Sequence, residues 1–577
     1  MFRTGIVALN DEMLQILGGL RSSGRGAQCN SSATSLSPTE RHEQTPHRRY
    51  PRYRRVLPPL SGIAYWAARK EKNVSSDYFL ASRDVGWLAV GASLFASNIG
   101  SEHLVGLAGT GAASGLAVGH FEWLASFILL LLGWLFVPFY LRSGVYTMPE
   151  FLERRYNPAA RSYFTWVSIV GYVLTKISVT LFAGGVVMRA VTGYDFWTSA
   201  AILIVITGLY TIFGGLRAVI YTEVMQAVVL IVGSITLMFI GLHAVGGWSG
   251  LQARVPPDFF SMWKPSSHKD FPWTGVVFGA PILGIWYWCT DQHIVQRVLA
   301  ARNIQEARRG TIFAGYLKIL PVFIFVLPGI VAAALYQDVR SGQADSAYPL
   351  LVTRLLPIGF KGLVLAGMLA ALMSSLASAF NSCSTLLTWD VYRKWRPAAS
   401  EARLVFVGRV TTVILVFLGL AWIPFMKYVS PQIYIYLQSV QAYIAPPIAA
   451  VFLLGILSPR LNGKGALSAL WAGFVLGFAR LLLELDKSNL STTGLTYWYA
   501  NINFLHFAAL LFLLCSAILI AVSFLTEPPA PARVADLTLQ TVAPSELVAV
   551  APKERKFEIG LSVLLAAVIG VLWIVFR

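Results

Sequence analysis

The chain alternates long apolar runs with short polar connections over most of its length. Many of these runs approach the ~20 residues that an α-helix needs to cross a bilayer. Because every backbone polar group must be satisfied inside a bilayer, apolar runs of this length predict helices. We predict thirteen membrane spans, at residues 83–113, 116–141, 162–193, 197–216, 218–243, 272–299, 311–336, 358–388, 403–425, 430–456, 464–485, 502–525 and 556–576.

The first of these spans is polar at its centre. The stretch ASLFASNIGSEHLVGLAGTG, residues 92–111, carries Asn98, Glu102 and His103. Unpaired polar groups are costly in hydrocarbon, so we expect this stretch to have a functional role within a membrane span. Gly100 permits the helix to be interrupted, and an interrupted helix exposes backbone groups that bind ions and solutes.

A second interruption is expected in the span 272–299. Gly279, Pro281 and Gly284 lie before or beside the motif WYWCTDQ, and Asp291 lies toward its inner end. Each interrupted span is followed by four more spans, which gives two five-span blocks, 83–243 and 272–456. Such weak internal symmetry indicates a transporter built from inverted repeats.

The composition supports a protein that crosses the membrane many times. Of the 577 residues, 56% are hydrophobic and 13% are charged, whereas a soluble protein is about 25% charged. The net charge of +18 gathers in short loops between apolar runs, which indicates cytoplasmic loops rather than a nucleic-acid-binding surface. Three of the four cysteines lie in apolar runs, so no disulfide-stapled external domain is expected.

Loop charge predicts the orientation. We place the basic loops at 140–163, 296–310, 390–397 and 458–465 in the cytoplasm. The loops around 245–270, 337–350 and 486–500 carry fewer basic residues and are placed outside, as is Arg577. Two peripheral helices are expected within 464–525, followed by a cytoplasmic linker at 526–555 and a C-terminal membrane helix at 556–577.

The N-terminal segment departs from this pattern. Residues 1–61 include a polar, Arg-rich stretch that is typical of disorder or of a mis-started chain. The motif GIAYWAARK at 62–70 resembles the last turns of a helix whose beginning is missing. We therefore interpret residues 62–82 as the end of a truncated N-terminal helix and a cytoplasmic loop. An ordinary disordered tail is the alternative.

Several motifs together resemble the sodium/glucose cotransporter branch of the sodium:solute symporter family. They include FASNIGSEHLVGLAGTGAASG, SGVYTMPEFL, GGLRAVIYTEVMQ, WYWCTDQ and ALMSSLASAFNSCSTLLTWDVY, and the resemblance covers residues 62–485. It implies an all-α LeuT-type 5+5 inverted repeat with two broken helices and additional C-terminal spans. It also implies that downhill sodium entry drives uphill solute uptake by alternating access.

The serine pair in MSSLAS suggests a sodium site. Sodium is a hard cation that prefers oxygen ligands. Ser374 and Ser375 could equally bond back to the preceding helical turn. The resemblance implies that these two hydroxyls bind sodium together with the carbonyls of Ala96, Ile99 and Ala371.

Buried polar residues suggest a solute site. A sugar needs directional donors and acceptors, and a site that leaves its own polar groups unpaired without the right hydroxyl discriminates between solutes. For each residue the alternative is a polar group satisfied by a neighbouring helix. The resemblance implies sugar contacts by Asn98, His103, Glu122, Lys318 and Gln438. We also expect Glu102, Tyr287 and Trp288 in the solute site. We expect Glu122 and Lys318 to pair, which lowers the cost of burying both charges.

The resemblance also implies gates on both sides of the solute. Tyr287 follows the second expected break and matches an inner gate, where its ring can stack on the apolar face of a pyranose. Leu107, Phe121 and Tyr434 match outer-gate positions, although ordinary helix packing explains these three equally well.

Two departures concern the solute and the number of ions. Gly284 stands where relatives often carry a polar residue that touches the sugar, and Ser101-Glu102-His103 also occurs in relatives that carry myo-inositol. Some relatives bind a second sodium ion. Here that site lacks part of its usual ligand set, because Glu223 replaces the usual aspartate and Ala377 replaces a hydroxyl, although Ser97 and Ser378 remain.

We therefore predict a sodium-driven symporter for a hexose such as glucose or galactose, with one sodium per sugar. A sodium/myo-inositol symporter is the nearest alternative, and a transporter-like membrane sensor is the other. No catalytic constellation predicts an enzyme. Sodium is the expected coupling ion, without a further cofactor. The expected partners are the solute and the bilayer of a bacterial inner membrane, without nucleic acid or an obligate protein partner.

Overall fold

The computed structural model describes residues 83–213, 216–429, 432–490, 494–542 and 552–577. The expectations for residues 1–61 and 62–82 lie outside these ranges. The described residues are mostly helical and form no strand beyond the isolated bridges Val85–Ala301 and Lys264–Pro272. Ten helices in the described ranges are long and apolar enough to cross a membrane.

The ten helices and the thirteen predicted spans describe largely the same residues. Residues 102–143 are helical on both sides of Gly115, whose backbone leaves the helix with φ 75° and ψ −152° and so separates the two spans predicted there. The segments around 87–98 and 273–299 consist of shorter helices, because each is interrupted. The protein is therefore a multi-pass membrane protein.

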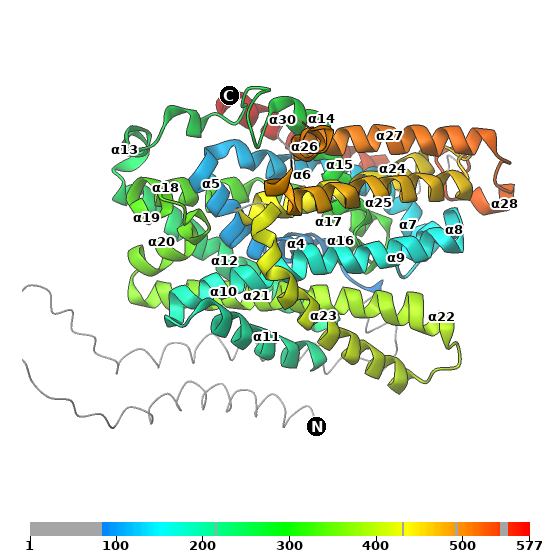
Figure 1. Ribbon diagram of the computed structural model, residues 1–577, viewed down its shortest axis with the longest axis horizontal. Coiled ribbons are helices and arrows are strands. Elements are labelled where there is room, and N and C mark those ends of the chain that lie inside the picture. The colour runs from blue at the N-terminus through cyan, green and yellow to red at the C-terminus, as the bar shows by residue number, and fades with distance from the viewer. Residues whose placement is uncertain (1–82, 214–215, 430–431, 491–493, 543–551) are drawn as a thin grey trace, which may run out of the picture. The chain divides into compact units, whose positions relative to one another are not determined.

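The first block of the repeat runs from a broken helix to a long helix near residue 244 (Figure 1). Its elements are α4 (Trp87–Asn98), η4 (Glu102–Leu107), α5 (Ala108–Ser114), η5 (Gly115–Gly119), α6 (His120–Leu131), η6 (Leu132–Phe136), α7 (Val137–Ser143), α8 (Met148–Arg155), α9 (Pro158–Tyr172), η7 (Val173–Ile177), α10 (Ser178–Thr192), α11 (Phe196–Phe213) and α12 (Leu216–Ala244). A short connection follows, with α13 (Gly247–Arg254) and η8 (Pro257–Phe260).

The second block repeats this order. Its elements are α14 (Trp273–Phe278), α15 (Ala280–Gly284), η9 (Ile285–Thr290), α16 (Gln292–Leu299), α17 (Ile304–Leu317), η10 (Val322–Val326), α18 (Leu327–Leu335), α19 (Gln337–Arg340), η11 (Ala344–Ser346), α20 (Ala347–Leu355), α21 (Ile358–Thr385), η12 (Leu386–Tyr392), α22 (Arg393–Trp395), α23 (Glu401–Val429) and α24 (Ile433–Leu457). The fold is therefore the expected 5+5 inverted repeat with two broken helices.

The remaining elements lie at the periphery of the repeat. They are α25 (Gly463–Leu485), η13 (Lys487–Asn489), α26 (Leu495–Asn501), α27 (Phe504–Leu525), α28 (Pro531–Val534) and α30 (Pro552–Val575). Helices α25 and α27 pack beside α24 (Figure 1).

The first break lies where the sequence predicts it. Helix α4 ends at Asn98, and Ile99 has an extended backbone with φ −76° and ψ 92°. A Cβ added to Gly100 would lie 2.6 Å from Oγ of Ser375. Only a residue without a side chain permits so close an approach, so Gly100 brings the break against α21.

The second interrupted span has two interruptions. The predicted one lies at Gly279, between the end of α14 and the start of α15, and Pro281 lies in the first turn of α15, where a missing N–H costs nothing. The chain also leaves the helix at Asp291, with φ −69° and ψ 124°, after Tyr287 rather than before it. The Asp291 carboxylate accepts a 3.0 Å hydrogen bond from the backbone N–H of His293 and caps α16.

The C-terminal helix is held by buried charge. Residues 304–310, predicted as part of a basic loop, form the first turns of α17 instead. Arg308 is buried and pairs with Glu558 of α30 at 3.2 Å, and the Glu558 side chain is fully buried. Arg309 bonds Glu558 as well, at 3.1 Å. These pairs explain why basic residues here lie inside the bundle rather than in a loop.

The described part of the chain contains six π-helical segments. They are η4, η6, η7, η9, η10 and η12. Segments of this kind occur frequently at functional sites. Two of them adjoin the breaks, because η4 begins just after the first break and η9 ends just before the second.

Candidate functional site

A buried lysine organises the centre of the repeat. Lys318 Nζ donates to Oδ1 of Asn98 at 2.5 Å and also pairs with the carboxylate of Glu122. His103 Nε2 lies 3.2 Å from the other oxygen of Glu122 and 3.4 Å from Lys318 Nζ. We call Asn98, His103, Glu122 and Lys318 the central cluster. The expected Glu122–Lys318 pair is present.

Interrupted or ending helices position the central cluster. Asn98 is the last residue of α4, and His103 lies in η4 just beyond the break. Glu122 is in the first turn of α6, and Lys318 follows the last residue of α17. All four residues are at most 6% exposed. Buried charges are tolerated when they are paired and hydrogen-bonded, as they are here.

Tyr287 lies on the cytoplasmic side of the central cluster in the predicted orientation. Its hydroxyl accepts a 2.9 Å hydrogen bond from Nδ2 of Asn98. Lys176 Nζ lies 3.5 Å from the same hydroxyl and 4.5 Å from the centre of the ring. Lys176 also pairs with Asp291 at 3.5 Å, and Tyr172 bonds that carboxylate. The predicted inner-gate tyrosine is thus joined to both breaks.

Lys176 and Tyr172 were not predicted from the sequence as site residues. A lysine in the middle of an apolar span is itself a signal of function, and Lys176 lies within the helical run Pro158–Arg189. Its partner Asp291 is far away in sequence, so only the fold shows the pair.

Aromatic residues surround the central cluster. The Trp288 ring lies 5.4 Å from Lys318 Nζ, in reach of a cation–π interaction. On the other side, the Phe121 and Tyr434 rings meet edge to face at 5.6 Å, and Tyr434 bonds the Gln438 side chain. The structure therefore brings together two of the three predicted outer-gate residues. Leu107, the third, is fully buried.

Three of the predicted sodium ligands, Ala96, Ile99 and Ser375, lie at or against the first break. Ser375 of α21 faces Gly100, as described above, and Ile99 and Ala371 are buried, whereas Ala96 is half-buried. The last carbonyls of a helix lack partners in the next turn, so the end of α4 offers oxygens to a cation. The side chains of Ser374 and Glu223 lie outside the described residues.

The remaining predicted positions have ordinary surroundings. Glu102 accepts a 3.2 Å hydrogen bond from Ser101, which also donates to Thr180 at 3.0 Å. Ser97 donates to the carbonyl of Leu94 at 3.2 Å and is thus satisfied within its own helix. A Cβ on Gly284 would lie 2.9 Å from Ile128, so the glycine allows α6 to pack closely.

The chain matches known proteins over most of its length. Residues 78–473 match the model of the Sodium:solute symporter family. The chain is 42% identical to mouse sodium/glucose cotransporter 4, covering 83% of this chain and 76% of the relative. It is 41% identical to the human sodium/myo-inositol cotransporter, covering 82% and 72%.

Solved structures share the fold. A sodium-coupled sialic acid symporter in a substrate-bound outward-open state superposes with a TM-score of 0.67 at 22% identity, covering 83% of this chain and 98% of that one. The transporter Mhp1 of the nucleobase-cation-symport-1 family, in a closed conformation, gives 0.50 at 15% identity, covering 80% and 97%. With 396 consecutive residues inside the family model, a LeuT-type repeat and two broken helices, the chain belongs to the sodium:solute symporter family and couples sodium entry to solute uptake.

Proposed function

We propose that the solute is a hexose such as glucose or galactose and that it binds at the central cluster. The observation that carries the proposal is the convergence of donors and acceptors on Lys318, from Asn98, His103 and Glu122. Each of these groups can exchange an internal hydrogen bond for one to a sugar hydroxyl. The names of the sodium/glucose cotransporters that the chain resembles support the same solute class.

Two aromatic and two polar residues complete the proposed solute site. Tyr287 and Trp288 supply aromatic faces, whose rings lie 5.2 Å apart, and an aromatic face packs against the apolar face of a pyranose. Gln438 supplies an amide from α24, and Glu102 a carboxylate from η4. We propose Tyr287 as the inner gate and Leu107, Phe121 and Tyr434 as the outer gate.

We propose a single sodium at the first break, bound by the carbonyls of Ala96, Ile99 and Ala371 and by the hydroxyls of Ser374 and Ser375. One charge crossing 100 mV gains about 2.3 kcal/mol. A tenfold sodium gradient adds about 1.4 kcal/mol, so one ion supports a solute gradient of roughly 500-fold. A second ion would square that ratio.

Sodium-driven uptake in proteoliposomes tests the solute. We expect glucose or galactose to be accumulated when sodium is imposed outside, and to compete with each other. Accumulation of myo-inositol with no uptake of either hexose would select the alternative that the 41% identical inositol relatives suggest. Reversal potentials measured against imposed sodium and solute gradients then give the ion ratio, and a ratio of two would contradict the single-site proposal.

The proposed membrane is a bacterial inner membrane, with the basic loops on its cytoplasmic side. The exposed residue Arg396 then faces inward, whereas the exposed residue Ser341 faces outward. An impermeant thiol reagent applied to intact cells should label Ser341→Cys and leave Arg396→Cys unlabelled. The reverse pattern would overturn the orientation.

A further inference from the structure

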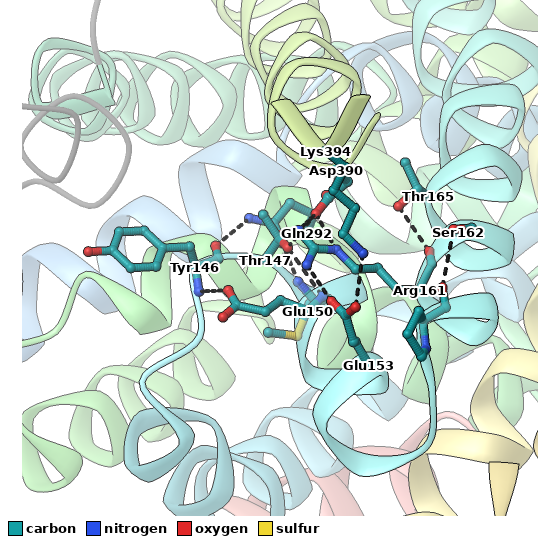
Figure 2. Close-up of polar contacts among 12 residues, drawn as sticks. Tyr146, Thr147, Glu150, Glu153, Arg161, Ser162, Thr165, Gln292, Asp390 and Lys394 are labelled. Atoms are coloured by element: carbon teal, nitrogen blue, oxygen red, sulfur yellow. Dashed lines mark hydrogen bonds and ion pairs between the residues drawn. The ribbon is translucent and has the colours of Figure 1, made fainter. Parts of the chain in front are cut away.

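The charged cluster around α8 is balanced within the protein. Figure 2 shows that Arg161 pairs with Glu153 and with Asp390, and that Lys394 pairs with Glu153, at 2.9 Å. Two cations therefore meet two carboxylates among these four side chains. Charges that leave water are tolerated when opposite charges compensate them. A cluster of this kind needs no added ion.

The charged side chains near the first break are not balanced in this way. Lys318 pairs with Glu122, and Lys176 pairs with Asp291 at 3.5 Å. Glu102 lies close enough to both lysines to interact with them electrostatically, but each ammonium group already has a carboxylate of its own. These five side chains therefore comprise two positive and three negative charges.

The imidazole of His103 does not restore the balance. An imidazolium donates from both ring nitrogens, and Nδ1 of His103 is buried without a hydrogen-bond partner among the described residues. A charged ring would leave that N–H unsatisfied. Its other nitrogen would also lie 3.4 Å from the Lys318 ammonium, which repels a second positive charge. We therefore count His103 as neutral, and one negative charge remains in excess.

Glu102 is held by a hydroxyl rather than by a cation. Ser101 donates to Oε2 of Glu102 at 3.2 Å and also contacts Thr180 of α10 at 3.0 Å. Within the described ranges, no basic side chain forms an ion pair with Glu102. The residue is only partly buried, so particles of the size of a water molecule or a sodium ion have access to it.

The carboxylate of Glu102 lies beside the proposed sodium site. A Cβ added to Gly100 would lie 2.9 Å from Oε2 of Glu102 and 2.6 Å from Oγ of Ser375. Both oxygens thus approach the same point at the first break, and their separation cannot exceed the sum of these two distances. Helix α4 ends just before this point, at Asn98, and its last carbonyls lack partners in a following turn.

A single excess negative charge among oxygen ligands suits a monovalent hard cation. The proposed ligands of the sodium ion are carbonyls and hydroxyls, which are neutral and cannot offset its charge. Opposite charges a few ångströms apart attract strongly where little water screens them. One sodium ion brings the charge count of the described group to zero, whereas a second ion would leave an excess of positive charge.

We propose that the Glu102 carboxylate is the charged member of the sodium site and compensates the coupling ion at the first break. The assignment rests on the sodium ligands proposed above and does not depend on the identity of the solute. Because Glu102 also belongs to the proposed solute site, one carboxylate then lies next to both the ion and the solute.

Equilibrium binding of radioactive sodium to the purified full-length protein tests the proposal. The measurement contains no solute, and choline replaces sodium at constant ionic strength. Glu102→Gln removes the charge but keeps an oxygen that accepts from Ser101. We expect the dissociation constant of sodium to rise at least about tenfold, because the ion loses a negative charge within a few ångströms.

Two variants separate the charge from the shape of the site. Ser101→Ala removes the hydroxyl and keeps the carboxylate, so its effect on the dissociation constant of sodium should be much smaller than that of Glu102→Gln. The matched control is Glu153→Gln, which removes a carboxylate from the balanced cluster in Figure 2 and should bind sodium like the unsubstituted protein. If Glu102→Gln does not fold, Glu102→Ala takes its place.

Ser375→Ala separates this proposal from the proposed sodium site. Weaker sodium binding in both Ser375→Ala and Glu102→Gln supports the role of Glu102. An unchanged dissociation constant in Glu102→Gln, with weaker binding in Ser375→Ala, would overturn that role and leave the sodium site standing. Unchanged binding in Ser375→Ala would refute the sodium site and with it the placement of Glu102 there. Equal losses in Glu102→Gln and Glu153→Gln would show a structural effect and would also overturn the proposal.

Discussion

Lys318 Nζ donates a hydrogen bond to Oδ1 of Asn98 across 2.5 Å, joining the end of α17 to the last residue of α4. The same ammonium group pairs with Glu122. One side chain of the second block therefore holds the first break and α6 together. Any solute that binds here has to replace part of this internal bonding, so stability and solute affinity are linked at the same residues.

Glu122→Ala should reduce stability as well as transport. The substitution leaves the buried Lys318 ammonium without its carboxylate, and breaking a buried pair in this way costs roughly 3–5 kcal/mol. Glu122→Gln keeps an acceptor for Lys318 and should cost less. Thermal unfolding of the purified protein in detergent measures both. Equal unfolding temperatures for Glu122→Ala and the unsubstituted protein would show that the pair does not stabilise the fold.

Gln438→Ala should weaken solute binding with little loss of stability. A stranded buried hydrogen-bonding group costs about 1–3 kcal/mol, or about 5- to 150-fold in affinity. The control is Gln441→Ala, which removes the same side chain from a buried position further along α24. The apparent affinity for the solute, measured from sodium-driven uptake, tests this prediction. An unchanged value in Gln438→Ala would remove this residue from the proposed solute site.

Gly100→Ala should impair sodium binding. The added Cβ would lie 2.6 Å from Oγ of Ser375 and 2.9 Å from a carboxylate oxygen of Glu102, and overpacking of this kind typically costs about 1–3 kcal/mol. We expect a rise in the sodium concentration needed for half-maximal uptake. Gly560→Ala on α30 is the matched control, because no atom lies within 4 Å of its added Cβ. Identical sodium dependence in both variants would contradict the proposed site.

Asp345 lies in a segment predicted to be outside, and we expect it to make the stability of the protein depend on pH. Its Oδ2 accepts a 3.3 Å hydrogen bond from the backbone N–H of Ile433, at the start of the helix that carries Tyr434. Burial raises the pKa of this carboxyl from 3.8 to about 7. Its neighbours Asp338 and Arg354 pair with each other at 3.3 Å. The carboxyl therefore remains protonated in the folded protein at mildly acidic pH.

The sign of the effect follows from linkage. Because the pKa of Asp345 is raised in the folded protein, its contribution to the free energy of unfolding is complete below pH 3.8 and is lost as pH rises through about 7. The unfolding temperature should fall between pH 5 and about 8, and Asp345→Asn should flatten that fall. Asp338→Asn, at an exposed carboxylate, is the control. Parallel pH profiles for Asp345→Asn and the unsubstituted protein would refute the assignment.

Glu558→Gln should loosen the C-terminal helix. Its carboxylate is fully buried and contacts both Arg308 and Arg309, so the neutral variant leaves buried Arg308 uncompensated, at a cost of several kcal/mol. Glu554→Gln, at a 45% exposed carboxylate, should cost at most about 1 kcal/mol. Protease sensitivity of the segment before α30 and the unfolding temperature measure the difference. Similar values for the two variants would show that burial does not strengthen the Glu558 contacts.

The helices and the first break could be predicted from sequence because their causes are local. Hydropathy depends on the composition of each run, and Gly100 lies among polar residues that have no other reason to be in a span. The interruption at Gly279 could be predicted as well, because Gly279 and Pro281 are local signals, and Pro281 occupies a first-turn position that proline tolerates. The break at Asp291 was not predicted, although aspartate is a common residue at the start of a helix such as α16.

Contacts between distant segments were predictable only where the resemblance supplied them. It brought Glu122 and Lys318 together, and the structure shows the pair. It did not supply Lys176 with Asp291, or Arg161 with Asp390, whose partners lie in different blocks. Hydropathy and spacing describe one segment at a time, so they cannot show which charges of two segments meet. Arg308 was placed in a loop for the same reason, because its partner Glu558 is far along the chain.

The π-helical segments have a consequence for how the sequence of this protein can vary. A π turn closes with an i→i+5 hydrogen bond and so contains one residue more than an α turn. In η9 that surplus residue lies between Gly284 and Asp291, beside Tyr287. Deleting one residue there would convert the π turn into an α turn, so the segments on either side would keep their register while the residues of the widened turn, Tyr287 among them, would shift in position. Length changes of a single residue are thus a route by which such a chain could alter its central site while keeping every helix.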